Sequence, residues 1–267
     1  MPRSFLIASR LFFLIASLAL LAATAFAGSP IKSPTKAPQG IVGDDDRVAV
    51  ETTDYPWRAI GRINMVNGAY CTGTLIGPSQ VLTAAHCLWD RRGQRWAPPD
   101  WLHFLAGYRR GGALASFPVT SYRRAAEYPA VVGNRRDHLA SDWAILELEQ
   151  PAGDDLGFLT LEQLVKSDLN GEANESIGVQ QAGYSHDMSY VLSLHPDCQV
   201  VGFAADGALM AHTCDATEGD SGSPILRRRG DDLTIVGLHV GSIDWKGRTF
   251  GVAVPATTLI GPASDSR

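Results

Sequence analysis

The segment Gly219-Asp220-Ser221-Gly222-Ser223-Pro224 places a serine between glycines in a loop-forming stretch. Glycine permits tight turns and a close approach of the backbone. A loop of this kind can direct the amide groups of Gly219 and Ser221 toward one point beside the Ser221 hydroxyl. Acyl transfer needs this combination, because a nucleophile must act together with donors for the oxyanion that forms on the attacked carbonyl. The segment therefore predicts a nucleophilic Ser221, with an oxyanion hole made by Gly219 and Ser221.

A hydroxyl is a weak nucleophile at neutral pH, so it needs a base and a group that orients the base. The candidate base is His86, which ends the apolar, strand-like run Val81-Leu82-Thr83-Ala84-Ala85. The candidate orienting group is Asp142, which heads the apolar run from Trp143 to Leu148. Each residue taken alone also fits a structural role, as a core histidine, a strand cap or a turn serine. Together they predict that His86, Asp142 and Ser221 form a catalytic set.

Another class of serine acyl-transfer enzyme, the α/β-hydrolases, does not fit this order. Those enzymes carry Gly-x-Ser-x-Gly on a strand-to-helix turn, followed by the acid and then the histidine. Here Ser223 stands at the second glycine position, and too little of the 267-residue chain follows Ser221 to complete such a fold.

The three segments resemble those around the catalytic triad of trypsin-like serine proteases, which have the chymotrypsin fold. The resemblance covers about residues 41–255, and three motifs in one order are far more specific than a lone Gly-Asp-Ser-Gly. The start of this region, with Tyr55-Pro56-Trp57, looks like that of the secreted bacterial glutamyl endopeptidases. The resemblance implies a serine endopeptidase that works through an acyl-enzyme intermediate without a metal or other cofactor. A catalytically silent protein of the same fold, acting only by binding, is the alternative.

The resemblance also implies the architecture: an all-β fold of two six-stranded antiparallel β-barrels, with the active site in the cleft between them. The sequence itself shows short apolar runs separated by turn residues, which favour a β-barrel or sandwich. We expect a protease domain at 41–267, with an N-terminal barrel at about 41–150 and a C-terminal barrel at about 172–255. The expected strands are 59–66, 72–76, 81–84, 102–107, 117–122, 143–148, 176–183, 188–194, 199–204, 209–213, 224–227, 233–239 and 249–254.

Residues 1–27 have the pattern of a secretory signal peptide. Arg3 and Arg10 precede an uncharged apolar run that is shorter than the ~20 residues of a membrane span, and Ala25-Phe26-Ala27 is a small-x-small cleavage site. The pattern predicts a secreted protein, extracellular or periplasmic, without stable membrane association after cleavage; an uncleaved anchor is the alternative. Residues 28–40 are rich in Pro, Ser and Lys and read as a pro-segment or linker.

Composition limits the partners. The chain is 45% hydrophobic and 19% charged, with a formal net charge of -5. This is the balance of a globular protein, and the lack of a basic surplus argues against nucleic acid. We expect protein or peptide substrates and a monomer. The acidic run at 44–46 predicts a solvated turn, with calcium binding as the alternative.

Export would permit disulfides, and the four cysteines allow three pairings. The family resemblance implies a bridge between Cys71 and Cys87, which leaves Cys198 to pair with Cys214. Free buried thiols are the alternative. A zinc site is not expected, because the sequence contains no Cys-x-x-Cys spacing.

The resemblance further implies activation from a zymogen. In trypsin-like proteases, a segment like Ile41-Val42-Gly43 becomes the new N-terminus, and its amine pairs with the aspartate before the nucleophile, here Asp220. The residue before Ile41 is Gly40, not the Arg or Lys of trypsin-type zymogens. The alternative is an ordinary first strand, with Asp220 hydrogen-bonded locally.

Specificity rests on three positions, and they disagree. Asp215 lies six residues before Ser221, where trypsin-like enzymes place the carboxylate that binds Arg or Lys. His239 matches the histidine with which glutamyl endopeptidases bind an acidic side chain. Ala216 stands where those endopeptidases tend to carry Thr or Ser. We expect an acidic residue on the acyl side of the cleaved bond (the P1 residue). One alternative is a basic P1 residue. Another is a broad or apolar preference, which would follow if Asp215 and His239 paired inside the pocket and cancelled both signals.

Overall fold

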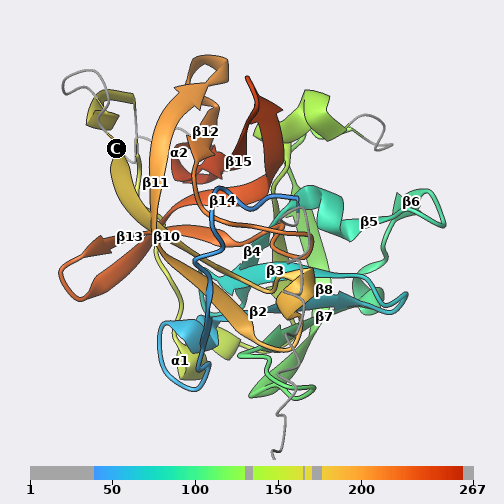
Figure 1. Ribbon diagram of the computed structural model, residues 1–267. Helices are drawn as coiled ribbons and strands as arrows, with labels where there is room; N and C mark the ends of the chain where they lie inside the picture. The colour runs from blue at the N-terminus through green and yellow to red at the C-terminus, as the bar shows by residue number, and fades with distance from the viewer. Residues whose placement is uncertain (1–38, 130–134, 165, 170–175, 261–267) are drawn as a thin grey trace, which may run out of the picture. The chain divides into compact units, whose positions relative to one another are not determined.

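The computed structural model describes residues 39–129, 135–164, 166–169 and 176–260, which belong to one compact unit (Figure 1). The predicted signal peptide 1–27 and all but the last two residues of the predicted linker 28–40 lie outside the described residues. None of the helices in the described part combines the length and the apolar character of a membrane-spanning helix. The described chain is mostly β-structure, as the sequence predicts.

The first half of the described chain forms a closed antiparallel barrel, as predicted. Neighbouring strands follow the order β2-β3-β4-β9-β8-β7, and β7 pairs back onto β2. Its strands are β2 (Ile60–Met65), β3 (Tyr70–Leu75), β4 (Gln80–Thr83), β7 (Leu102–Ala106), β8 (Ala115–Arg124) and β9 (Ala144–Leu148). Alternating side chains such as Ile63, Leu102 and Phe104 point inward and are almost completely buried, so the barrel has a packed interior.

The second half is a seven-stranded antiparallel sheet, in the order β1-β11-β10-β13-β14-β15-β12. An additional pairing of β12 with β11 joins six of these strands into a ring, and β1 is attached outside it. The strands are β1 (Val48–Val50), β10 (Ile177–Gly183), β11 (Leu192–Ala204), β12 (Leu209–His212), β13 (Pro224–Arg229), β14 (Asp232–Trp245) and β15 (Arg248–Pro255). The predicted strands 188–194 and 199–204 are one long strand, β11, which starts later than expected.

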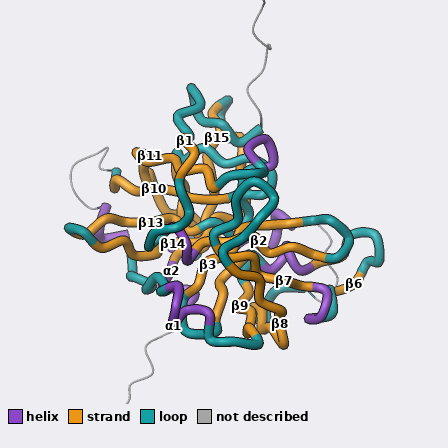
Figure 2. Tube along the Cα trace, turned by 90° about the horizontal axis from the view of Figure 1, so that it is seen from below, coloured by secondary structure: helices purple, strands orange, loops and turns teal. Residues whose placement is uncertain are grey.

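The short strand β1 corrects the expected boundary of the N-terminal barrel at residue 41. Val48 pairs with Leu194 of β11, so the beginning of the described chain joins the second sheet and not the first barrel (Figure 2). The barrel closes through β2 and β7 and therefore has no free edge for another strand. By contrast, β12 pairs with only the later part of β11, which leaves the segment around Leu194 open on one side.

Short elements complete the described fold. A two-stranded sheet of β5 (Trp89–Asp90) and β6 (Arg95–Trp96) follows a 3₁₀ turn, and the helices are α1 (Ala152–Leu156) and α2 (Ala256–Ile260). Both predicted disulfides are present, Cys71–Cys87 and Cys198–Cys214. The first ties β3 to the 3₁₀ turn after β4, and the second ties β11 to the segment that leads toward Ser221.

Candidate active site

His86 is held in a fixed orientation by Asp142. Strand β4 ends at Thr83, and the following 3₁₀ turn, Ala85–Leu88, carries His86. The His86 amide donates to one Asp142 oxygen at 2.9 Å, and the ring atom Nδ1 lies 2.7 Å from the other. Asp142 is completely buried. A carboxylate only accepts hydrogen bonds, so Nδ1 carries a proton and Nε2 is the ring atom available as a base.

The Ser221 loop is docked on the first barrel through Thr72 of β3. The Thr72 amide donates to the Ser221 carbonyl, and the Thr72 hydroxyl donates to the Gly219 carbonyl, both at 3.0 Å. At Gly222, where φ is +86°, a Cβ atom would lie 2.2 Å from the Thr72 carbonyl. Only glycine fits that position, so the glycine after the serine is required for docking. Sequence analysis missed Thr72, because nothing local marks it as a contact of a distant loop.

The two predicted oxyanion donors are oriented by hydrogen bonds on the far side of their peptide groups. The Glu218 carbonyl accepts from the His186 amide at 2.5 Å, and the Asp220 carbonyl accepts from the Ser223 amide at 2.9 Å. In a trans peptide the N–H points opposite to the C=O. The amides of Gly219 and Ser221 therefore point away from these partners. Among the described residues, neither amide has a hydrogen-bond acceptor of its own.

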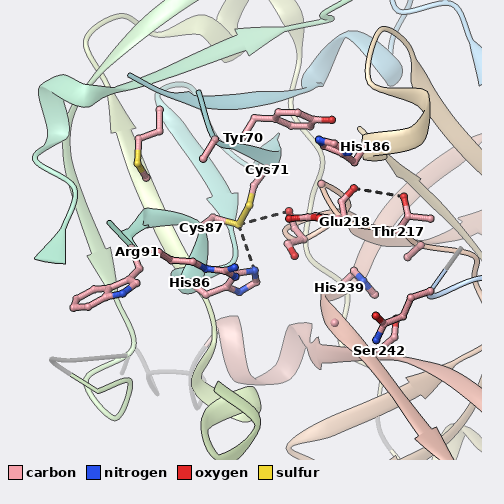
Figure 3. Close-up of a pocket in the computed structure, with 18 of the residues that line it drawn as sticks. Tyr70, Cys71, His86, Cys87, Arg91, His186, Thr217, Glu218, His239 and Ser242 are labelled. Carbon is pink, nitrogen blue, oxygen red and sulfur yellow. Dashed lines mark hydrogen bonds between the residues drawn. A yellow bond between two sulfur atoms is a disulfide. The ribbon is translucent and has the colours of Figure 1, made fainter. Parts of the chain in front are cut away.

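A pocket of about 880 Å³ brings residues of both halves together (Figure 3). His86 and Cys87 line one side, and Thr217, Glu218 and His239 line the opposite side. The predicted site residues that line it are His86, Ala216, Gly219, Ser221, His239 and the Cys71–Cys87 disulfide; Asp142 lies behind His86. Within the described chain, no hydrogen bond joins the Ser221 hydroxyl to the His86 ring; the Cys87 sulfur lies 3.9 Å from Nε2. Catalytic hydrogen bonds are often long before substrate binds.

The structure places Asp215 outside the pocket, which corrects its prediction as a substrate-binding residue. Its carboxylate accepts from the amides of Val42 at 2.7 Å and Asp46 at 3.1 Å. The carboxylate also lies 3.2 Å from Nδ1 of His195. Asp215 therefore pairs with His195, and not with His239 as one alternative had it. Burial alone would lower the pKa of His195, but the Asp215 carboxylate outweighs it and raises that pKa. Asp215 therefore anchors the segment before β1, and basic specificity loses its proposed carboxylate.

His239 reaches the pocket as the end of a buried histidine pair. Nε2 of His212 lies 3.0 Å from Nδ1 of His239, and Nδ1 of His212 accepts from the Cys214 amide at 3.2 Å. Burial lowers the pKa of His212 to about 3, so this ring is neutral. With Nδ1 as an acceptor, its proton sits on Nε2 and is donated to His239. His239 then carries a proton on Nε2, which makes that atom a donor.

The sequence analysis did not identify Ser242, which adds a hydroxyl to the pocket near His239. Ser242 lies on β14 three residues after His239, and both line the pocket (Figure 3). Ala216 lines the pocket too but offers only a methyl group. A serine within a long strand carries no local signal of a binding role, so only the three-dimensional arrangement identifies it.

Asp220 is hydrogen-bonded locally and not to Ile41. One of its oxygens accepts from the Ser185 hydroxyl at 2.6 Å and from the Thr217 amide at 2.8 Å. In this chain Ile41 is joined to Gly40, whose carbonyl accepts from the Ala216 amide at 3.1 Å. The pairing expected for an activated zymogen is therefore absent from this form of the chain. Asp220 is hydrogen-bonded locally, as the alternative has it, but Ile41 lies before the first strand and not in it. Burial raises the pKa of Asp220 to about 7.

Comparison with known proteins agrees with this geometry. The sequence matches the Trypsin family over residues 47–260. The chain belongs to the trypsin family of serine proteases. It is 30% identical over 201 residues to a glutamyl endopeptidase of Bacillus licheniformis, a match that covers 74% of this chain and 58% of that protein. The chain thus spans less than two thirds of that relative's length.

Two further comparisons place the chain within the fold. It is 24% identical over 212 residues to an extracellular metalloprotease of Bacillus subtilis, covering 77% of this chain and 63% of that one. Among solved structures, it is similar to a Glu endopeptidase in complex with MPD, with a TM-score of 0.65, 22% identity and coverage of 81% and 93% of the two chains. At 22% identity, the similarity to this solved structure shows the trypsin-like fold alone.

The described residues of this trypsin-family chain contain one group of metal-ligand type, Cys71, His86 and Cys87, whose ligand atoms lie within 4.8 Å of one another. Both sulfurs belong to the disulfide, so neither is a thiolate that could bind a metal. Calcium binding was the alternative for the acidic run at residues 44–46. In the structure, the Asp45 carboxylate of this run pairs with Arg47.

The raised pKa of Asp220 predicts a pH-dependent stability. The folded chain holds this proton more tightly than the unfolded chain, whose carboxyl has a pKa of 3.8. The contribution to the free energy of unfolding is therefore complete below about pH 4 and is lost as the pH rises through about 7. We expect Asp220→Asn to remove this decline. Denaturant unfolding from pH 4 to 8, with both proteins carrying Ser221→Ala to prevent self-digestion, measures the difference, and parallel curves would contradict the prediction.

Proposed function

We propose that the chain is a secreted serine endopeptidase that hydrolyses peptide bonds through an acyl-enzyme intermediate. One observation carries the proposal: the oriented His86 ring, Ser221 and two outward-pointing amides border the same pocket. Two barrels with this pocket in the cleft between them are part of the proposal, supported by the closed barrel and the ring-forming sheet. Two disulfides fit an oxidising compartment.

In the first step, the Ser221 oxygen attacks the substrate carbonyl carbon while Nε2 of His86 takes the hydroxyl proton. Asp142 keeps the ring in the required tautomer and stabilises the resulting imidazolium. The carbonyl oxygen becomes an oxyanion and accepts hydrogen bonds from the Gly219 and Ser221 amides. The carbon–nitrogen bond then breaks, His86 transfers its proton to the leaving amine, and the acyl group remains on Ser221 as an ester.

In the second step, water replaces the amine. His86 removes a proton from the water as it attacks the ester carbonyl, and the same two amides again stabilise the oxyanion. Collapse of this intermediate breaks the bond to Ser221, which regains its proton from His86, and releases the acid. None of these steps draws on a group beyond the named residues and water.

We further propose that the P1 side chain is acidic. A carboxylate needs donors in a partly desolvated site, and the Nε2 proton of His239 and the hydroxyl of Ser242 are two such donors at the pocket wall. The Asp215 carboxylate, which a basic side chain would need, is engaged by Val42 and Asp46. The name of the Bacillus licheniformis relative, glutamyl endopeptidase, agrees with this preference.

A fluorophosphonate probe tests the hydrolase proposal, because it reacts only with a serine activated by the base. The intact, processed protein should gain one probe per chain, and peptide mapping should place the adduct on Ser221. Ser221→Ala should not react, and Ser121→Ala, which removes an exposed serine of β8, should react like the wild type. A folded wild-type protein without any adduct would leave only the silent binding protein.

A further inference from the structure

Arg47 forms an ion cluster with two partly exposed carboxylates just before β1. Its side chain is only 2% exposed and bonds both oxygens of Asp187, at 3.1 and 2.6 Å. It also bonds both oxygens of Asp45, at 2.9 and 2.8 Å. Burial opposes the positive charge, but the two carboxylates outweigh it and raise the pKa of Arg47. Arg47 in turn holds the pKa of Asp187 below its usual value. The segment before β1 is therefore fastened to the turn that contains Asp187.

That turn, residues 185–187, contacts the loop before the nucleophile, residues 217–220, at three points. The bonds are Ser185 Oγ to Asp220 Oδ2 at 2.6 Å, the His186 amide to the Glu218 carbonyl at 2.5 Å, and Thr217 Oγ1 to Asp187 Oδ1 at 2.7 Å. The middle bond fixes the peptide group whose N–H is the Gly219 oxyanion donor. The position of the turn therefore decides where this donor points.

We propose that Arg47 is a positioning residue for the oxyanion site, acting through Asp187 and the His186 amide on the Gly219 donor. The inference deepens the proposed function and rests on it. Arg47 performs from inside the chain the ordering that the expected Ile41–Asp220 pair would perform from a new N-terminus. It contacts neither the substrate site nor the reacting atoms.

Electrostatics explains why the cation is needed. Without Arg47, the carboxylates of Asp45 and Asp187 would lose the cation that they share, and the charge of Asp187 would act on the buried Asp220 without compensation. Asp187 already raises the pKa of Asp220 by its charge, whereas Arg47 lowers it. Removal of the cation would therefore push the turn and the loop apart, and the Gly219 amide would lose its fixed direction.

The test compares Arg47→Met with Glu51→Gln. Glu51 pairs with Arg109 next to the same strand, so its variant removes an ion pair of this segment without touching the turn. Arg47→Met should lower the rate of fluorophosphonate inactivation and kcat/KM by about 10–100-fold, part of the loss seen when an oxyanion donor is removed. The KM should change little. Arg47→Lys, which keeps the charge but not the fork geometry, should fall in between, and Glu51→Gln should match the wild type.

Two further measurements keep a folding defect separate from a positioning effect. In Arg47→Met, hydrogen exchange should accelerate in residues 217–221 but not in β11. The double variant Arg47→Met/Thr217→Val should lose no more kcat/KM than the more damaged single variant, because both substitutions remove the same connection through Asp187. Wild-type rates in Arg47→Met, or equal losses in Glu51→Gln, would overturn the inference. A wild-type protein that does not react would refute the hydrolase proposal instead, and hydrogen exchange would still decide the role of Arg47.

Discussion

Ser221→Ala is expected to lower kcat for peptide hydrolysis by about 10⁶-fold, which is the scale of loss when a nucleophile of this type is removed. The reason is that Ser221 carries the proposed nucleophile and borders the same pocket as His86 and the two oriented amides, so the variant has no oxygen there to attack the substrate carbonyl. Binding should persist, because the pocket walls and the oxyanion donors remain. The measurement is kcat and KM with a peptide substrate, together with a thermal unfolding curve.

The neighbouring residue Ser223 shows why the unfolding curve matters. Ser223 belongs to the same loop and is fully buried, so a substitution of Ser223 would disturb packing. Ser221→Ala removes one oxygen from a position that lines the pocket, and its unfolding temperature should stay within a few degrees of the wild type. Retention of more than a small fraction of the wild-type kcat would refute the assignment of Ser221 as the nucleophile.

His239→Leu is expected to erase the preference for Glu over Gln at P1. The Nε2 proton of His239 would donate to a carboxylate, and a hydrogen bond to a charged group contributes about 1.5–3 kcal/mol. The ratio of kcat/KM for two peptides that differ only by Glu or Gln at P1 should therefore fall by about 10–100-fold. A ratio is the proper measure, because general damage to the enzyme affects both peptides.

His138→Leu is the matched control for this specificity experiment. His138 packs against the Tyr128 ring and is not among the residues that line the pocket. Its variant should keep the wild-type ratio. A wild-type enzyme that cleaves both peptides equally, or a ratio that His239→Leu leaves unchanged, would contradict the role proposed for His239.

Local sequence patterns predicted most of the strands, whereas the pairing of the two disulfides followed from the family resemblance. Strands such as β4 and β9 could be predicted because their apolar runs end at turn residues. His86 and Asp142 could then be predicted as site residues because they lie at the ends of these runs. The glycines around Ser221 were visible because a tight loop requires them. In each of these cases the signal lies within a few residues of the feature.

Contacts between distant segments could not be predicted in the same way. Asp215 stands at the position of a specificity residue, but the backbone amides of Val42 and Asp46 draw its carboxylate away from the pocket. His212 and Thr72 looked like ordinary strand residues, and their roles arise from partners far along the chain. Strand β1 joined the second sheet because of an open edge on β11, which no local pattern reveals.

The attachment of β1 has a mechanical consequence. This three-residue strand pairs along one side only, and its first residue, Val48, is 49% exposed. A pulling force applied to the N-terminal end of the described chain would first break the bonds of the preceding segment to Asp215 and Asp187. It would then detach β1 from β11 before it strained either of the larger sheets. Because Arg47 is released before β1, such a force would loosen the Gly219 donor while the rest of the protein stayed folded.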